Sequence, residues 1–215
     1  ALPTELNNHQ QLELVRDFVN EQFVKKGMVA DLAIHRDNPE NPHAHIMLTT
    51  RDINEQGFGM KQTAWNAKEL LLDWREGWAD AVNHHLYLAG QDIHVDHRSF
   101  EAQGIKLEPG IKLGVNDERR EKDGRDIIAE RVAEHDRIVR ENGEAIFKDP
   151  TLALDAITRQ QATFTKRDVG RWLNPRTIDA DQFQECLSAV LTSPEVVRLG
   201  KDAKGLQLQG EDVRE

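Results

Sequence analysis

The sequence predicts an α+β fold, in which an antiparallel sheet carries helices on one face and is followed by a small all-α module. Residues 9–26 and 65–90 place apolar side chains at helical spacing. Residues 28–35 and 43–50 have instead the composition and patterning of strands. Beyond residue 125 only helical patterns follow, which predicts a second, helical part of the chain.

The first helix and the two strands are expected to follow one another directly. The helix over residues 9–26 has Leu12, Val15 and Val19 on one face and is closed by Gly27. The loop between the strands, "RDNPENP", is rich in turn formers and prolines. An antiparallel hairpin is therefore the simplest way to join the two strands.

A second helix is expected over residues 65–90, beginning near Asn66 and ending at Gly90. The segment "DIHVDHR", residues 92–98, is expected to form a short strand. Residues 99–125 contain glycines, a proline and a charge cluster, so we expect an irregular segment there that leads into a linker.

The helical part is predicted from its capping signals. A helix over residues 126–143 is expected to end at Asn142-Gly143, and a short helix is expected after Pro150. Thr165 and Asp168 have the spacing of a capping box. Two more helices are expected over residues 179–192 and 193–200, the second with Ser193 as its N-cap and Pro194 as its first residue.

These changes in character predict the domain organisation. We expect a first domain over residues 1–115, a linker over 116–125, a helical module over 126–200 and a tail over 201–215. The first residues, "ALPTELNN", start without Met, and the last, "GLQLQGEDVRE", end abruptly. We therefore expect a piece of a longer polypeptide.

Charge and composition argue against some classes of protein. The formal net charge is −10, which disfavours a general nucleic-acid coat but leaves room for a local nucleic-acid site. Apolar runs stay well short of the roughly 18 residues of a membrane span, and we see no signal-peptide pattern. The single cysteine, Cys186, excludes an internal disulfide and fits the cytoplasmic location that we expect.

Three histidines surround the predicted hairpin loop. Successive side chains of a strand alternate between its faces, so His43 and His45 project from one face while Ile46 and Leu48 project from the other. When the apolar faces of the two strands are matched, His35 joins the other two histidines at the loop end. Residues that are distant in sequence thereby become neighbours in space.

Such a cluster is typical of a metal site. Three neutral imidazoles on rigid strands suit zinc or a divalent transition metal and leave at least one coordination position for water or substrate, as in catalytic sites. Asp37 is a candidate to orient one imidazole by accepting its second N–H. The alternative is that His35, His43 and His45 are ordinary surface histidines.

The segment "HRDNPENPHAHIMLTTR" resembles the third motif of the MobA/MobL relaxases, which belong to the histidine-hydrophobic-histidine superfamily of single-strand DNA nickases. The segments "GFGMKQTAWNAKELLLDWREGWADAVNHHL" and "VDHRSFEAQGI" look like those that follow in this family. The segment "ERVAEHDRIVRENGEAIFKDPTLALDAITRQQATFTKRDVGRWL" is similar to the helical lead-in to the helicase part of Ti-plasmid-type relaxase–helicases. The likeness covers most of residues 1–200.

The resemblance implies a relaxase-type fold with the active site on the sheet face opposite the helices. His35, His43 and His45 would bind Mg²⁺ or Mn²⁺, and the metal would hold the oxygens of one scissile phosphate. A tyrosine hydroxyl would attack the phosphorus, giving a 5′-phosphotyrosine link and a free 3′-hydroxyl. The implied function is the nicking of single-stranded DNA at a plasmid transfer origin during conjugation, in a bacterial cytoplasm and alongside other conjugation proteins.

The attacking tyrosine is the point at which this sequence departs from the family. In the family it lies near the N-terminus, ahead of anything present here, and the one tyrosine, Tyr87, is expected on the solvent side of the second helix. The helicase phosphate loop is also absent. We therefore expect this chain to supply the metal half of the chemistry, the nucleophile lying on a removed N-terminal part or the gene being truncated.

Other residues are candidates for contacts with DNA. Trp65 and Asn66 could stack on and hydrogen-bond an unpaired base, or could serve as core and capping residues. Asp96 and His97 could support the metal ligands or the substrate, or could be structural. The cationic candidates for phosphate contacts are Arg51, Lys61, Arg75 and Arg98, and a small patch of Lys166, Arg167 and Arg171 lies beside Trp172.

Two other functions stay open. His35 and Asp37 form an H-x-D pair, which is typical of the two-histidine, one-carboxylate iron site of oxygenases. Those sites usually occupy many-stranded β folds, whereas this chain is mostly helical. The other alternative is a non-enzymatic module that holds DNA or a transfer partner.

Overall fold

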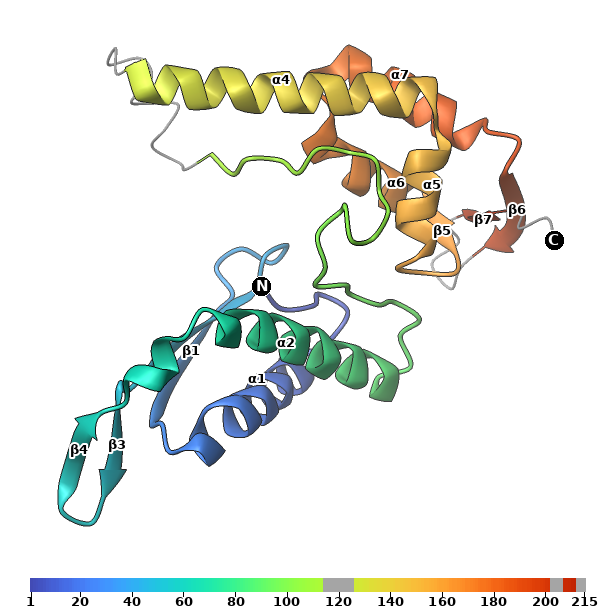
Figure 1. Ribbon diagram of the computed structural model, residues 1–215. Helices are drawn as coiled ribbons and strands as arrows, with labels where there is room; N and C mark the ends of the chain where they lie inside the picture. The colour runs from blue at the N-terminus through green and yellow to red at the C-terminus, as the bar shows by residue number, and fades with distance from the viewer. Residues whose placement is uncertain (114–125, 202–206, 212–215) are drawn as a thin grey trace. The chain divides into compact units, whose positions relative to one another are not determined.

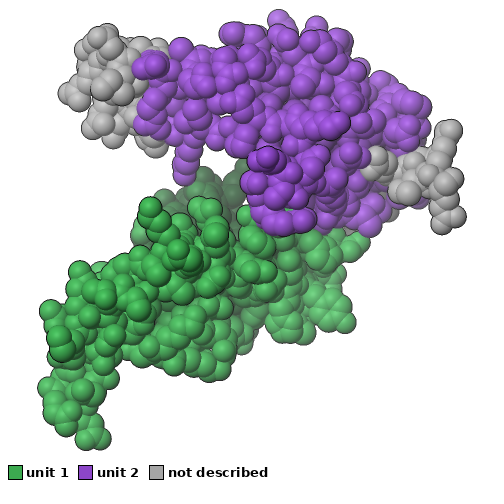
Figure 2. Space-filling view, viewed as in Figure 1, with its two compact units in different colours: residues 1–97 green, residues 98–215 purple. Residues whose placement is uncertain are grey.

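The computed structural model describes residues 1–113, 126–201 and 207–211. These residues form six α-helices and seven strands, and all the strand pairs are antiparallel. The chain divides into two compact units, Ala1–His97 and Arg98–Glu215 (Figure 2). The α+β class expected from the sequence is confirmed, with several small sheets in place of one. Within the described ranges, none of the helices combines the length and hydropathy that a membrane span needs.

The first unit opens with helix α1 (Asn8–Gln22), which begins at a capping box. The Asn7 side chain accepts hydrogen bonds from the N–H groups of His9 and Gln10, and the Gln10 side chain accepts one from the N–H of Asn7. A 3₁₀ turn, η1 (Val24–Lys26), then ends at Gly27, whose φ of +96° favours glycine.

Two separate ribbons follow (Figure 1). Strands β1 (Ala30–His35) and β2 (His43–Leu48) form the hairpin that the sequence predicts. Strands β3 (Arg51–Asn54) and β4 (Gly57–Lys61) form a second hairpin that the sequence analysis missed. The unit is completed by a 3₁₀ turn, η2 (Thr63–Asn66), and by helix α2 (Glu69–Leu88).

The core of this unit lies between the two helices and one face of the β1–β2 ribbon. Helices α1 and α2 pack on each other through rings in edge-on contact, with centroids 5.0 Å apart for Phe18 and Trp78 and 5.2 Å apart for Phe23 and Trp74. The same core receives the apolar side chains of the ribbon, which are Ala30, Leu32, Ile34, Ala44, Ile46 and Leu48. The histidines of β1 and β2 that alternate with these residues are therefore left on the opposite face.

Two expectations for this unit are wrong. Helix α2 begins at Glu69 and not near Asn66, because the extended backbone of Ala67 separates it from η2. The segment 92–98 forms no strand among the described residues. Its backbone at Val95 bonds instead to a helix side chain, since the Asn83 amide accepts from the Val95 N–H at 2.8 Å and donates to its carbonyl at 3.0 Å.

The second unit combines four helices with a three-stranded sheet (Figure 1). Phe164, Leu154 and Leu173 are fully buried in its core. Its helices are α4 (Asp126–Lys148), α5 (Thr151–Thr158), α6 (Lys166–Leu173) and α7 (Ala180–Leu191), with the 3₁₀ turn η3 (Asn174–Arg176) between the last two. Its strands are β5 (Phe164–Thr165), β6 (Val196–Lys201) and β7 (Gln207–Glu211), in the order β5-β7-β6. The predicted capping box of Thr165 and Asp168 is confirmed at the start of α6.

The expectation of an all-α module is wrong, because Val196–Lys201 forms a strand and not the helix expected after Ser193 and Pro194. Its pairing partner, β7, lies in the segment that was expected to be a tail. The residues of β6 alone therefore did not indicate that a neighbouring strand was present. The helix expected to end at Gly143 continues to Lys148.

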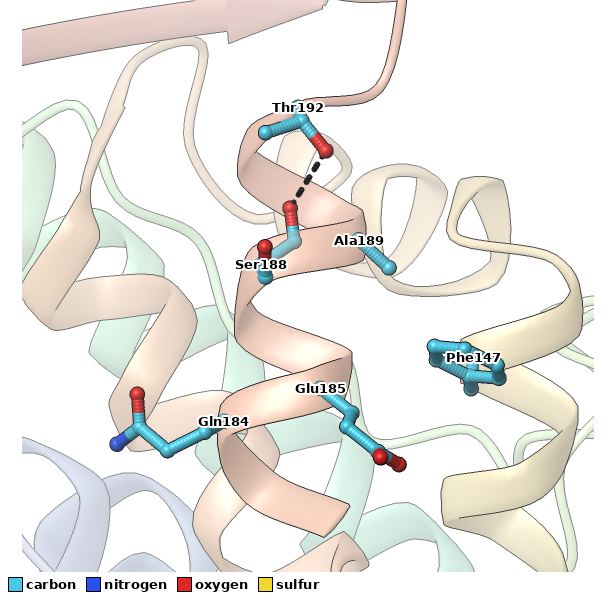
Figure 3. A pocket seen from close by; sticks show the side chains of 6 residues that line it. All are labelled: Phe147, Gln184, Glu185, Ser188, Ala189 and Thr192. Carbon is cyan, nitrogen blue, oxygen red and sulfur yellow. Dashed lines mark hydrogen bonds between the residues drawn. The ribbon is translucent and has the colours of Figure 1, made fainter. Parts of the chain in front are cut away.

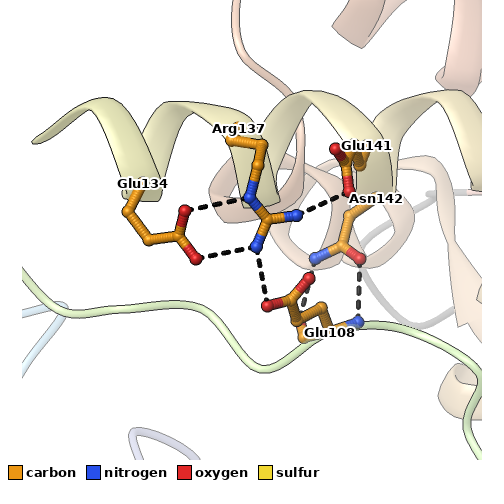
Figure 4. Close-up of polar contacts among 5 residues, drawn as sticks. All are labelled: Glu108, Glu134, Arg137, Glu141 and Asn142. Carbon is orange, nitrogen blue, oxygen red and sulfur yellow. Dashed lines mark hydrogen bonds and ion pairs between the residues drawn. The ribbon is translucent and has the colours of Figure 1, made fainter. Parts of the chain in front are cut away.

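The segment before α4 is anchored on the second unit. Ile105 and Leu107 are buried in its core. The Asn142 side chain of α4 accepts a hydrogen bond from the Glu108 N–H at 3.0 Å and donates one to the Glu108 carbonyl at 2.8 Å (Figure 4). The Arg137 guanidinium donates to the carboxylates of Glu108, Glu134 and Glu141, and it lowers the pKa of Glu134.

Because this segment packs with the second unit, the units divide at His97. The division lies ahead of the linker expected over 116–125, which is outside the described residues.

Candidate metal centre

The β1–β2 hairpin sets the positions of the three histidines. The register places His35 directly opposite His43 and Ala33 opposite His45. Residues that face each other in an antiparallel pair share a face of the ribbon, and so do residues two apart on one strand. All three imidazoles therefore leave the same face, as the sequence predicts.

The imidazoles form a tight group. Their ring centroids are 5.3 Å apart for His35 and His43, 4.7 Å for His35 and His45, and 5.2 Å for His43 and His45. One ring nitrogen from each lies within 4.8 Å of the others. His35 and His45 are exposed and His43 is half-buried, so the group is open to solvent on one side. This arrangement can hold one divalent cation and leave room for an incoming ligand.

The backbone fixes the orientation of one imidazole. His43 Nδ1 lies 3.0 Å from the carbonyl oxygen of Asn41, which can only accept a hydrogen bond. The Nδ1 atom must therefore carry the proton in this contact, which leaves the Nε2 lone pair for a metal. A backbone carbonyl therefore orients His43, and the role expected for Asp37 in orienting one imidazole stays a prediction.

Contacts with α1 and the N-terminal segment hold the loop between the strands in place. Arg36 donates from Nε to the Gln11 side chain at 3.3 Å and from Nη2 to the Asn8 carbonyl at 3.2 Å. The Leu2 N–H donates to the carbonyl of the buried Pro42 at 2.7 Å. These bonds tie one end of the loop to α1 and the other end to the N-terminal segment, so the loop that separates the histidines is fixed at both ends.

The other candidate residues are distributed over several elements. Arg51 and Lys61 face each other at the base of the β3–β4 ribbon, where Arg51 Nη1 donates to the Gly59 carbonyl at 2.9 Å. Trp65 and Asn66 both line a hollow of about 390 Å³ beside Leu48. Trp65 also packs against the core, so this side chain has the structural role that was the alternative to base stacking.

The remaining candidates are not part of the histidine group. Among the described residues, the side chains grouped closely enough to bind a metal ion are those of His35, His43 and His45, without Asp96 or His97. Arg98 is the first residue of the second unit. Tyr87 is 78% exposed in the last turn of α2.

One prominent feature of this unit, the exposed β3–β4 ribbon, was not predicted from the sequence. Its apolar side chains point into solvent, with exposed fractions of 66% for Phe58 and 83% for Met60. The turn signal was available, since the Asn54 side chain accepts from the Gln56 N–H just before Gly57, which has a φ of +106°.

Comparison with known sequences decides the family. Residues 1–123 match the profile described as "MobA/MobL family". The chain belongs to the MobA/MobL family. Proteins of this family are relaxases, which nick and transfer DNA.

Curated relatives of this MobA/MobL chain carry names from plasmid transfer. "Conjugal transfer protein TraA" of Agrobacterium fabrum is 39% identical over 94% of this chain and 20% of the relative. "Mobilization protein A" of Escherichia coli is 38% identical over 54% of this chain and 19% of the relative. A solved chain described as "Molecular Basis of Vancomycin Resistance Transfer in Staphylococcus aureus" is 34% identical over 46% of this chain and 54% of that chain, with a TM-score of 0.42. The chain spans about a fifth of the length of the TraA relative.

Proposed function

We propose that this chain supplies the metal site for nicking single-stranded DNA at a plasmid transfer origin during conjugation. The observation that carries the proposal is the group of His35, His43 and His45 on the solvent face of the β1–β2 ribbon, within a segment that matches the MobA/MobL family. The opposite face of the ribbon is filled by the core, so this face alone is available to a DNA strand.

The geometry suits an extended strand that lies across the ribbon. A bound divalent cation would hold the non-bridging oxygens of one phosphate and offset the negative charge that develops there. The carbonyl of Asn41 bonds to Nδ1 of His43 and so leaves its Nε2 atom to bind the cation. Arg51 and Lys61 remain proposed phosphate contacts, and Asn66, Arg98, Asp96 and His97 remain proposed contacts or supports.

We propose Mn²⁺ as the better fit to this donor set, with Mg²⁺ as the alternative. The three donors are imidazole nitrogens, whereas Mg²⁺ prefers carboxylate, carbonyl and water oxygens. The same donor set contains no carboxylate among the described residues, so the iron oxygenase alternative, which needs Asp37 as a ligand, is not proposed further.

The tyrosine that attacks the phosphorus is assigned to a residue other than Tyr87. Trp74 and Trp78 of α2 pack against the same core as the apolar face of the β1–β2 ribbon, whereas the histidines leave the opposite face. Tyr87 belongs to this helix, and its side chain is directed to solvent. The hydroxyl of Tyr87 therefore has no route to a phosphate on the histidine face.

We assign the metal site to the unit Ala1–His97 and a lead-in to a helicase part to the second unit, which also takes in residues 98–113 of the domain expected over 1–115 and the strand β7 of the expected tail. The proposed partners are the single-stranded transfer origin and other proteins of the conjugation apparatus, in a bacterial cytoplasm. Support comes from relatives whose names refer to conjugal transfer and mobilization.

A nicking assay on a labelled single strand that carries the transfer origin tests the proposal. The chain is assayed with Mn²⁺ and with the upstream segment of its reading frame supplied, against the triple variant His35→Ala, His43→Ala, His45→Ala. We expect cleavage that needs both the cation and the histidines. Binding without cleavage would favour the non-enzymatic module instead, and cleavage that survives in the triple variant would refute the metal role.

A further inference from the structure

The second unit contains a helix-turn-helix with a small sheet attached. Elements follow in the order α5, β5, α6, α7, β6, β7, and the sheet order is β5-β7-β6. Helices α5, α6 and α7 contact one another, and η3 forms the turn between α6 and α7. This is the topology of a winged helix, in which the second helix of the pair, here α7, lies in the major groove when the module reads DNA.

The exposed surface of α7 has the wrong charge for that role. Its exposed stripe consists of Asp181, Gln184, Glu185, Ser188 and Thr192. The whole stretch 177–195 contains four acidic residues and no lysine or arginine. Affinity for duplex DNA comes mainly from cations that neutralise phosphates, and acidic side chains in the groove would repel them. The surface of α7 is therefore unsuited to DNA.

The surface of α7 instead combines acidic side chains with a partly apolar hollow. A hollow of about 430 Å³ is lined by Phe147 of α4 and by five residues of α7 and its C-cap, Gln184, Glu185, Ser188, Ala189 and Thr192. Phe147 is 51% exposed and stands beside α7 on the side of Glu185 and Ala189 (Figure 3). The residue that follows Phe147 in α4, Lys148, is paired with Glu144 at 3.7 Å.

Helix α7 is held firmly enough to present a fixed surface. The amide end of the Gln182 side chain lies over Gly143 of α4, 2.3 Å from the ideal Cβ position of that glycine. The Gln182 amide donates to the Arg140 carbonyl at 3.0 Å, and the Cys186 thiol donates to the Gly143 carbonyl at 3.2 Å. The hollow is thus bounded by two helices locked together.

We propose that α7 and the end of α4 form a docking site for a cationic amphipathic helix of a partner protein. One apolar side chain of that helix enters the hollow between Phe147 and Ala189, and its lysines or arginines face Asp181 and Glu185. Acidic surfaces select basic partners through charge complementarity, and a half-exposed aromatic ring supplies the apolar anchor. This role is independent of the DNA-nicking proposal, because it uses no residue of the first unit.

The test uses the whole chain and a fluorescent amphipathic Leu–Lys peptide of about 15 residues, long enough to form a helix on the surface. Anisotropy titration at low salt gives the affinity. We expect Asp181→Lys with Glu185→Lys to weaken binding at least about tenfold, which corresponds to about 1.4 kcal/mol. The matched control, Glu130→Lys with Asp155→Lys, makes the same change in net charge at exposed acids outside α7 and should stay near the parent affinity.

A second variant tests the apolar contact in the hollow beside Phe147. Phe147→Ser removes a half-exposed ring without opening the core, and we expect it to weaken peptide binding several-fold while circular dichroism stays unchanged. Amide NMR shifts on adding the peptide should fall on residues 181–192. Equal affinity in the two charge-reversed variants would overturn the proposal. So would shifts on α7 that are caused by duplex DNA and not by the peptide.

Discussion

Removing one imidazole from the histidine group should remove most of the stabilisation that Mn²⁺ gives to the first unit. An ion about 2.1 Å from three nitrogens holds those nitrogens about 3 to 3.5 Å apart. They lie within 4.8 Å of one another without it, a difference that small side-chain rotations can close. At a cation concentration about 100 times the Kd, binding stabilises the fold by about 2.7 kcal/mol. For a unit of about 100 residues this raises the Tm by about 10 to 20 °C.

His45→Ala leaves two ligands, and an affinity loss of about 100-fold would reduce the stabilisation to about 0.4 kcal/mol, or about 2 to 3 °C. Tryptophan fluorescence follows the transition, because Trp65, Trp74 and Trp78 all lie in the first unit. The matched control is His84→Ala, which removes an exposed histidine of α2 outside the group. An Mn²⁺ shift that is the same in the parent and in His45→Ala would refute the assignment of the site.

Three other substitutions test the fold and the assignment of roles. Gly143→Ala should destabilise the second unit by about 1 to 2 kcal/mol in urea, although alanine is the better helix former, because its Cβ would displace the Gln182 amide from its hydrogen bonds with the Arg140 carbonyl and the Ile178 N–H. Gly110→Ala, with nothing within 4 Å of the added Cβ, should be neutral. Burial raises the pKa of the Cys186 thiol. The stability that the neutral thiol contributes is therefore complete below the ordinary thiol pKa and is lost as the pH rises through the pKa of the folded state. Over that pH range the free energy of unfolding should fall more steeply in the parent than in Cys186→Ala. Tyr87→Phe should leave cleavage of the labelled single strand unchanged in the nicking assay, and a loss of cleavage would contradict the assignment of the nucleophile to another residue.

The parts of the fold that the sequence predicted are those specified by local signals. The histidine face followed from strand alternation alone, because the period of two leaves no freedom once Ile46 and Leu48 face the core. The capping box of Thr165 and Asp168 is likewise a signal contained within four residues. Both features can therefore be predicted from the sequence without knowing which residues are neighbours in space.

The parts that failed depend on distant partners. The strand Val196–Lys201 exists through pairing with β7, and the strand expected at 92–98 is absent because the Asn83 side chain takes up the backbone groups of Val95. The Asn41 carbonyl could not be predicted as the partner of His43. Every residue of the loop has a backbone carbonyl, and the sequence does not indicate which of them lies beside the imidazole. Side-chain patterns predict faces, whereas backbone partners require the fold.

The two faces of the β1–β2 ribbon separate stability from chemistry, and this decides how variants at the site can be interpreted. Leu32, Ile34 and Ile46 are partly buried against the core, so truncation there would remove apolar contacts and destabilise the unit together with any site on it. His35 and His45 are exposed on the other face and contribute no buried area to the core. Their substitution should leave the unfolding transition without metal almost unchanged, so that a loss of metal binding or cleavage in these variants reports on the site and not on the fold.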